Sequence, residues 1–209
     1  MFIAPFSQDL EPPQNPGRFN GVSKDYAQAA SWYRKAAEQG HTGAQFNLGN
    51  AYYKGEGVSK DYAQAVSWYR KAAEQGLAVA QYSLGNEYYR GKAVPKDYVQ
   101  AASWFRKAAE QGYDRAQYDL GMLYVSGEGV PQDDAKAASW FREAAEQGHA
   151  GAQYDLGLFY ESGKGVPYDL VQAKSWYRKA ADQGHVKAKG ILEILGRLEK
   201  LSRETKGKF

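Results

Sequence analysis

The segment DYAQAASWYRKAAEQG at residues 25–40 returns almost unchanged as DYAQAVSWYRKAAEQG at residues 61–76, with Val66 in place of Ala30. The chain's five tryptophans share one repeat position, each 36 residues after the one before: Trp32, Trp68, Trp104, Trp140 and Trp176. A period of this length is typical of repeat proteins, in which every unit is one supersecondary structure stacked on its neighbours. The period therefore decides the fold before any local pattern does.

One unit, Ala44 to Gly76, divides into two helical patterns around a glycine-rich turn. In the second half, apolar residues recur at steps of three and four, and Gly76 follows where the helix should end. The first half has a narrower apolar stripe that includes Leu48. Gly49 lies in the middle of this first helix, where glycine costs about 1 kcal/mol relative to alanine. Since this glycine recurs in all four copies, we expect close backbone approach of the partner helix there.

The predicted fold is all-α, a solenoid of stacked helix hairpins with a 36-residue period. The repeat array should occupy residues 21–185. It should begin with an unpaired second helix at 24–39 and continue with four hairpins, at residues 42–75, 78–111, 114–147 and 150–183. We expect residues 1–20 to form a proline-rich strap or linker, and residues 186–209 to form a capping helix and a basic tail.

Composition excludes several classes of protein and site. The chain of 209 residues has no cysteine, so disulfides, zinc sites with cysteine ligands and thiol nucleophiles are absent. The tail from Gly196 to Phe209 takes five of the 27 basic and two of the 24 acidic residues, which leaves 22 of each in the body. Without a basic surface to attract phosphates, nucleic acid is not an expected partner.

Targeting signals are also missing from the sequence as written. No apolar run reaches the roughly 20 residues that span a bilayer. The start, MFIAPFSQDLEPPQNPG, lacks the positive charge and the apolar run of a signal peptide. The expected location is the cytoplasm by default, or an exported compartment if the native start lies upstream, and the sequence leaves that choice open. The expected oligomeric state is a monomer.

The repeat resembles that of a known family. A-x-x-x-L-G-x-x-Y in the first helix, G-x-G-V-x-x-D in the turn and A-x-x-W-[YF]-x-x-A-A-x-x-G in the second helix are similar to the Sel-one-like repeat, a relative of the tetratricopeptide repeat. The resemblance covers residues 21 to about 192. It implies a right-handed α-solenoid and a role in protein–protein interaction as adaptor or scaffold, commonly in bacteria. Some cysteine-rich relatives have been described as β-lactamases, but this chain lacks their cysteines.

A search for catalytic motifs gives no candidate. No serine is followed three places later by lysine, and neither H-E-x-x-H nor G-x-S-x-G occurs. The G-x-G turns lack the rest of a dinucleotide or phosphate loop. His41, His149 and His185 share the repeat position at which Leu77 and Tyr113 stand in the other copies, which favours a partly buried turn contact over a metal ligand. No catalytic residue, metal or cofactor is predicted.

Variation between copies points to a binding face. Beside the packing stripe of each first helix runs a second stripe, whose residues change in class from unit to unit. We call it the variable stripe, and its candidate partner-binding residues are Phe46, Asn50, Tyr53, Lys54, Tyr82, Asn86, Tyr89, Arg90, Tyr118, Met122, Tyr154 and Leu158. Variation confined to one face of a copied unit is how a solenoid would acquire a distinct binding surface.

The resemblance to tetratricopeptide arrays implies that the variable stripe lines a concave groove. Asn50 and Asn86 then match asparagines that hold peptide backbone or a terminal carboxylate, with Lys54 and Arg90 as basic neighbours. The aromatic column of Phe46, Tyr82, Tyr118 and Tyr154 has two interpretations. The rings either pack between successive first helices and stay mostly buried, or they form an exposed contact surface of large area and low entropic cost.

Three functions therefore remain as hypotheses. The first is a non-enzymatic adaptor or scaffold that binds a peptide or protein segment on the concave face. The second is a cell-wall or β-lactam hydrolase, suggested by family analogy alone. The third is a passive spacer within a longer repeat protein.

Overall fold

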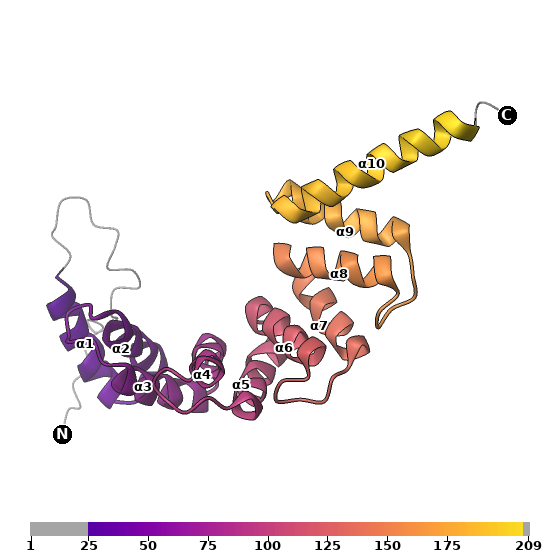
Figure 1. The fold of residues 1–209 in the computed structure, drawn as a ribbon. Coiled ribbons are helices and arrows are strands. Elements are labelled where there is room, and N and C mark those ends of the chain that lie inside the picture. Colours follow the sequence, from indigo (N-terminus) through magenta and orange to yellow (C-terminus); the bar gives the residue numbers. More distant parts are fainter. Residues whose placement is uncertain (1–24, 207–209) are drawn as a thin grey trace, which may run out of the picture. The chain divides into compact units, whose positions relative to one another are not determined.

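The computed structural model describes residues 25–206, which form ten α-helices and no strand. Their bounds are α1 (Tyr26–Glu38), α2 (Thr42–Lys54), α3 (Tyr62–Glu74), α4 (Ala78–Arg90), α5 (Tyr98–Glu110), α6 (Asp114–Ser126), α7 (Asp134–Glu146), α8 (Ala150–Ser162), α9 (Leu170–Asp182) and α10 (Val186–Lys206). The expected all-α repeat fold is confirmed (Figure 1). The strap predicted at residues 1–20 lies outside the described residues.

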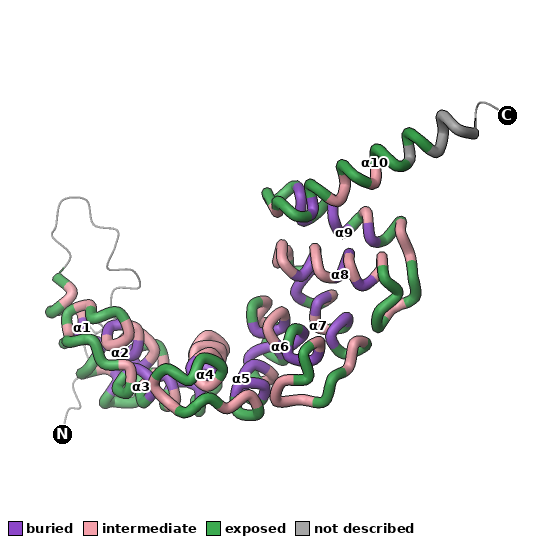
Figure 2. The backbone as a smooth tube through the Cα atoms, viewed as in Figure 1, coloured by how far each residue is buried: buried purple, intermediate pink, exposed green. Residues whose placement is uncertain are grey.

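The chain divides into two compact units, Met1–Lys96 and Asp97–Phe209. The described part of the first unit holds α1 to α4, and that of the second holds α5 to α10. Within each unit every helix packs mainly on the helices that precede and follow it in the chain. Buried residues lie along the faces where these helices meet (Figure 2).

The core of each hairpin is built mainly from small residues packed around buried aromatic rings. In α3 the buried face consists of Ala65, Val66, Tyr69 and two further alanines, as the period of three and four residues predicts. Leu48 of α2 and its three counterparts in α4, α6 and α8 are fully buried. Alanine lets paired helices approach closely, and the aromatic ring fills the remaining space between them.

Buried glutamines fix each first helix to the preceding second helix. The Nε2 atom of Gln45 donates to the carbonyl oxygen of Ala37 at 3.2 Å, and Gln153 donates in the same way to Ala145 at 3.0 Å. Gln81 and Gln117 repeat the contact in the other copies. The acceptors lie in the last turn of a second helix, where backbone carbonyls have no partner within the helix. These bonds hold the register between neighbouring repeats.

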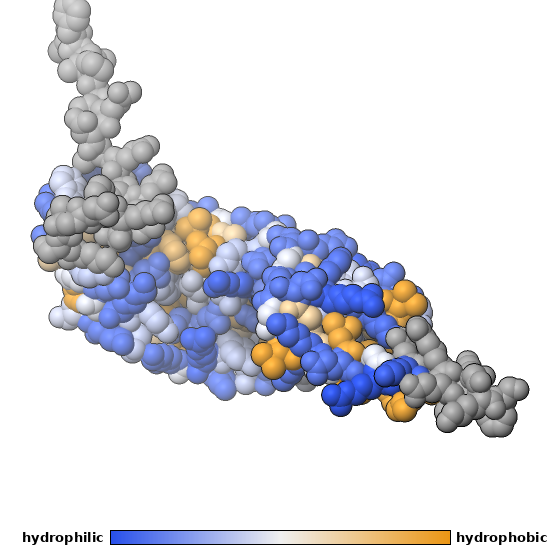
Figure 3. All heavy atoms as spheres, turned by 90° about the horizontal axis from the view of Figure 1, so that it is seen from above, coloured by the Kyte–Doolittle hydropathy of each residue, from blue (hydrophilic) through white to orange (hydrophobic). Residues whose placement is uncertain are grey.

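The last helix, α10, begins as a first helix and continues for 21 residues. Ile191, Leu192 and Leu195 pack on the buried cluster around Tyr177 of α9. Other apolar residues of α10 remain exposed, namely Val186, Ile194, Leu198 and Leu201. Figure 3 shows the visible hydrophobic surface as separate small patches among hydrophilic side chains. Within residues 25–206, no helix is both long and apolar enough to span a membrane.

Candidate functional site

The variable stripe lies on the first helices α2, α4, α6 and α8, and none of its twelve candidate residues is fully buried. Four of them are exposed: Lys54, Tyr89, Arg90 and Met122. The other eight, which include the whole aromatic column, are half-buried. The column therefore has a packed side and a side that faces solvent.

The packed side of the column rests on the second helix of the same hairpin. The ring centroids of Phe46 and Tyr69 are 5.7 Å apart, and those of Tyr154 and Tyr177 are 5.9 Å apart. Tyr118 packs on Phe141 in the same way, at 5.6 Å. In these three hairpins the column residue thus packs on an aromatic ring of the second helix.

The two asparagines of the variable stripe already form bonds within the chain. The hydroxyl of Tyr69 donates to Oδ1 of Asn50 at 2.8 Å. Nδ2 of Asn86 donates to the carbonyl oxygen of Tyr82, one turn earlier in α4, at 3.1 Å. A peptide held by these amides would therefore have to use their remaining donors and acceptors.

In the first unit, Tyr53 belongs to a cluster of aromatic rings and lysines. Its ring meets that of Tyr62 edge to face, with centroids 5.2 Å apart. Nζ of Lys92 lies 3.8 Å from the centroid of Tyr62 and 5.3 Å from that of Tyr53. Hydrogen bonds from Lys60 and Lys92 lower the pKa of Tyr62. The cluster orders this end of α2, since each cation lies against a ring face.

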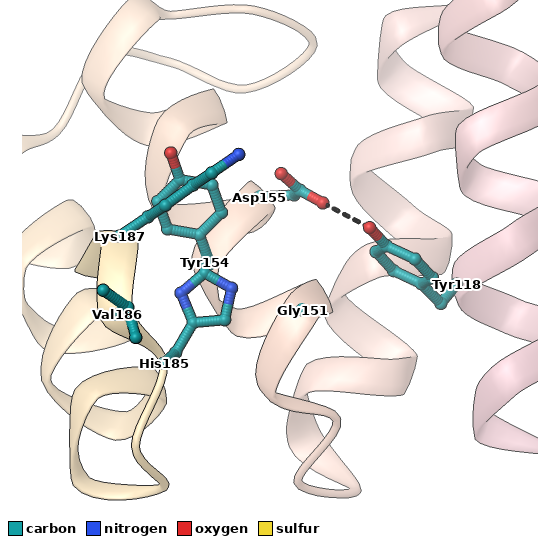
Figure 4. Close-up of a pocket in the computed structure, with 7 residues that line it drawn as sticks. All are labelled: Tyr118, Gly151, Tyr154, Asp155, His185, Val186 and Lys187. Carbon is teal, nitrogen blue, oxygen red and sulfur yellow. Dashed lines mark hydrogen bonds between the residues drawn. The ribbon is translucent and has the colours of Figure 1, made fainter. Parts of the chain in front are cut away.

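A pocket of about 270 Å³ opens within the second unit (Figure 4). It is lined from three first helices, by Tyr118 of α6, by Gly151, Tyr154 and Asp155 of α8, and by His185, Val186 and Lys187 at the start of α10. Two members of the predicted column, Tyr118 and Tyr154, therefore meet in one cavity. The structure brings none of the other ten candidate residues into its lining.

Asp155 is the carboxylate of this pocket, and its Oδ2 atom accepts a hydrogen bond from the Tyr118 hydroxyl at 3.0 Å. Burial raises the pKa of Asp155, an effect opposed by the hydrogen bond from Tyr118 and by the positive charge of Lys187. Burial also raises the pKa of Tyr118, so its hydroxyl keeps the proton that it donates. Within residues 25–206, Asp155 takes part in no ion pair.

Two of the three histidines that follow the helix-ending glycine stack on the column, whereas His41 is exposed. His149 lies on Tyr118 and His185 on Tyr154, each pair with centroids 4.6 Å apart and planes inclined by 26°. Nδ1 of each accepts a backbone N–H, from Ala152 at 3.1 Å and from Ala188 at 3.3 Å. An accepting Nδ1 requires a neutral imidazole. Burial also lowers the pKa of His149, which favours the same neutral form.

Sequence reasoning missed Asp155 as a site residue. Its repeat position is polar in every complete unit, as Asn47, Ser83, Asp119 and Asp155, directly after the aromatic column. That polar position next to a ring was the signal that could have identified it. Among the described residues, no group of three histidine or acidic side chains is arranged to hold a metal ion.

Comparison with known proteins places the chain among repeat proteins of one type. A family model described as Sel1 repeat matches residues 15–41, 42–77, 78–113, 114–149 and 150–185. Among solved structures, a protective antigen present in uropathogenic Escherichia coli strains and displaying an SLR fold is 44% identical, with a TM-score of 0.79. The match covers 80% of this chain and 36% of that one, so the chain spans little more than a third of the antigen's length.

Two further structures support the likeness. A Sel1 repeat protein from Oxalobacter formigenes is 44% identical over 80% of this chain and 67% of that chain, with a TM-score of 0.73. Cysteine rich protein B of Helicobacter pylori is 28% identical over 63% of this chain and 95% of that one, with a TM-score of 0.51. No curated protein gives a significant match.

Proposed function

The chain belongs to the Sel1 repeat family, and we propose that it is a non-enzymatic adaptor that binds a segment of another protein on the variable stripe. Proteins of this family are generally scaffolds for protein–protein interaction and are typically not enzymes. What this family leaves undecided is where on the repeat a partner binds and what the partner is.

The observation that supports the variable stripe is the pocket of the second unit. It opens between three first helices, and its walls include two rings of the aromatic column. Rings that are fixed on one side and half-exposed on the other bring large contact area at low entropic cost. Exposed Met122, one turn after Tyr118 on α6, extends this surface with a flexible apolar side chain.

The hydrolase hypothesis has no residue set to support it. The pocket lining contains no serine, threonine or cysteine that could act as a nucleophile. Its imidazole, His185, directs Nδ1 to the backbone N–H of Ala188 and lies against the Tyr154 ring. Helicobacter pylori cysteine rich protein B shares the fold, but this chain has no cysteine.

The adaptor function predicts that charge placed on the variable stripe weakens binding. Peptides would be selected on the purified chain from a random library, and their affinities measured for two stripe variants, Met122→Asp and Leu158→Asp. We expect each to weaken binding at least about tenfold, since a buried unpaired carboxylate costs more than 1.4 kcal/mol.

The matched controls place the same change on second helices. Val99 in α5 and Val171 in α9 are 63% and 78% exposed, so Val99→Asp and Val171→Asp should leave affinity within about twofold of the parent. Equal losses in both sets, or the absence of any selected peptide, would favour the spacer hypothesis.

A further inference from the structure

The charged groups in the pocket between α6, α8 and α10 suggest which kind of side chain it would bind, a point that the proposed function does not specify. Its lining contains one carboxylate, Asp155, and one exposed ammonium group, Lys187. The two groups differ in how they are held. Asp155 is half-buried and fixed by the Tyr118 hydroxyl, whereas Lys187 stands on a flexible, solvated stem. A fixed, desolvated charge attracts a partner more strongly than a mobile, hydrated one.

The Asp155 carboxylate has unused acceptor capacity. A carboxylate offers about four lone-pair positions on its two oxygens. Tyr118 takes one of those on Oδ2, and Oδ1 accepts no hydrogen bond from the described residues. A guanidinium group could therefore bind both oxygens in the bidentate, charge-assisted geometry that arginine and carboxylates favour. Figure 4 shows the carboxylate reaching from α8 toward Tyr118, beside the Tyr154 ring.

The walls of the pocket suit a flat cation. Tyr118 and Tyr154 line the pocket with one face of each ring covered by a histidine, so a flat guanidinium group would lie against the exposed parts of these rings. His149, which stacks on Tyr118, accepts a hydrogen bond at Nδ1, and burial lowers its pKa. In its neutral form His149 does not repel a cation.

Size and position restrict the occupant to one side chain. Pockets for drug-sized ligands measure about 300–1,000 Å³. The 270 Å³ here falls below that range. Gly151 leaves the pocket floor without a side chain, where Arg115 and Lys187 stand in the units on either side. Gly43 of α2 is the other glycine at this repeat position, so the space is a feature of some repeats and not of every repeat.

We propose that this pocket binds the guanidinium group of an arginine side chain on the partner segment, with Asp155 as its ionic partner and Tyr118 and Tyr154 beside it. This inference rests on the proposed adaptor function for its peptide source. Burial of the Asp155 carboxylate, which has no ion pair among the described residues, disfavours its charged form, and a bound guanidinium would relieve that cost.

The test uses defined peptides and does not depend on finding the natural partner. Acetyl-Gly-Arg-Gly-amide, its lysine and glutamate analogues, and the isosteric neutral citrulline analogue would be titrated into the full chain. Backbone amide signals of Tyr118, Gly151 and Asp155 would be followed by NMR. We expect saturable shifts with the arginine peptide and weaker shifts with the lysine peptide. The citrulline peptide and buffer alone should give no shift.

Two isosteric or near-isosteric variants should change the affinity for the arginine peptide in opposite directions. Asp155→Asn keeps the acceptor for Tyr118 but removes the charge, and should weaken the arginine peptide at least about tenfold. The thermal stability of this variant should not fall, since the carboxylate has no ion pair to lose. If Asp155 had only a structural role, the variant would be less stable than the parent. Lys187→Gln removes the one cation of the lining and should strengthen binding.

The reverse pattern would overturn the proposal. Binding of the glutamate peptide, lost in Lys187→Gln and improved in Asp155→Asn, would make the pocket an anion site. No shift with the arginine peptide at about 10 mM would also reject it, since useful recognition of one side chain should give at least millimolar affinity. Either result leaves the library selection on the variable stripe unaffected, so failure of the arginine site and failure of the adaptor function are separable.

Discussion

At the scale of single residues, the glycine in the middle of each first helix shows why the repeat is so uniform. A Cβ atom built on Gly49 would lie 2.7 Å from the ring of Tyr69, and one on Gly157 would lie 2.5 Å from Tyr177. Gly121 and Phe141 repeat the contact at 2.6 Å. We expected backbone approach of the partner helix; the space is in fact taken chiefly by the aromatic ring of the second helix.

This contact predicts opposite effects for the same substitution at two places in α2. Gly49→Ala should lower the free energy of unfolding by about 1 to 3 kcal/mol, because the ring of Tyr69 is held on both sides and cannot move without strain. Gly43→Ala, where nothing lies within 4 Å, should raise it by up to about 1 kcal/mol through helix propensity. Urea denaturation of both variants checks the pair. Two changes of the same sign would refute the explanation.

The sequence predicted the packing that every repeat shares, but it did not predict the contacts between neighbouring repeats. The period aligns Tyr118 with Tyr154, but it does not show that the Tyr118 hydroxyl reaches Asp155, 37 residues later. Nor does it show that His149 stacks on Tyr118. Such pairs depend on how one hairpin is rotated on the next, which no property of a single unit determines.

At the scale of helices, the two helix types begin by different means. Every second helix has an aspartate N-cap whose carboxylate accepts a backbone N–H, as Asp61 does from Gln64 at 3.0 Å. The first helices α2, α4 and α6 have no side-chain cap. Their starts are fixed instead by the buried glutamine that joins them to the preceding helix.

Loss of an aspartate cap should therefore lower the stability of the protein. We expect Asp61→Ala to lower the free energy of unfolding by about 1 kcal/mol, because the N–H of Gln64 loses its acceptor. Asp61→Asn keeps an acceptor oxygen and should cost only a few tenths of a kcal/mol. Chemical denaturation of both variants separates capping from charge. An equal loss in the two would assign the effect to the charge at the helix N-terminus instead.

The turn between the two helices of one repeat differs from the others, because Ala93 replaces the second glycine of the G-x-G pattern. The second glycine of the G-x-G turn passes close to the start of an earlier helix, where a Cβ on Gly57 would lie 1.8 Å from the carbonyl oxygen of Tyr26. Gly129 and Gly165 meet Tyr98 and Asp134 in the same way. The corresponding Ala93 has no positive φ angle, so its turn follows a different path. The sequence shows this exception as GKA, but not its geometric result.

At the scale of the molecule, the period alone was enough to predict an all-α repeat fold, because each unit buries its apolar faces only against its neighbours. Trp68 of α3 illustrates this dependence, since it packs on the cluster of α1 and α2 that includes Tyr33 and Leu48. Trp32 holds the same repeat position in α1 and is 44% exposed. Identical residues thus differ in burial according to their place in the array.

Nearest-neighbour packing predicts that the helices do not open together. Hydrogen exchange followed by mass spectrometry should show lower opening free energies for α1 than for α3, since α1 packs mainly on α2, whereas α3 packs on α2 and α4. The last turns of α10, beyond the contacts of Leu195 with α9, should also exchange early. Gly49→Ala should lower protection in α2 and α3 while leaving α7 to α9 unchanged, because those helices share no contact with Tyr69. One common opening free energy for all helices would instead mean that coupling between units exceeds the stability of any single unit, and the array would behave as one cooperative domain.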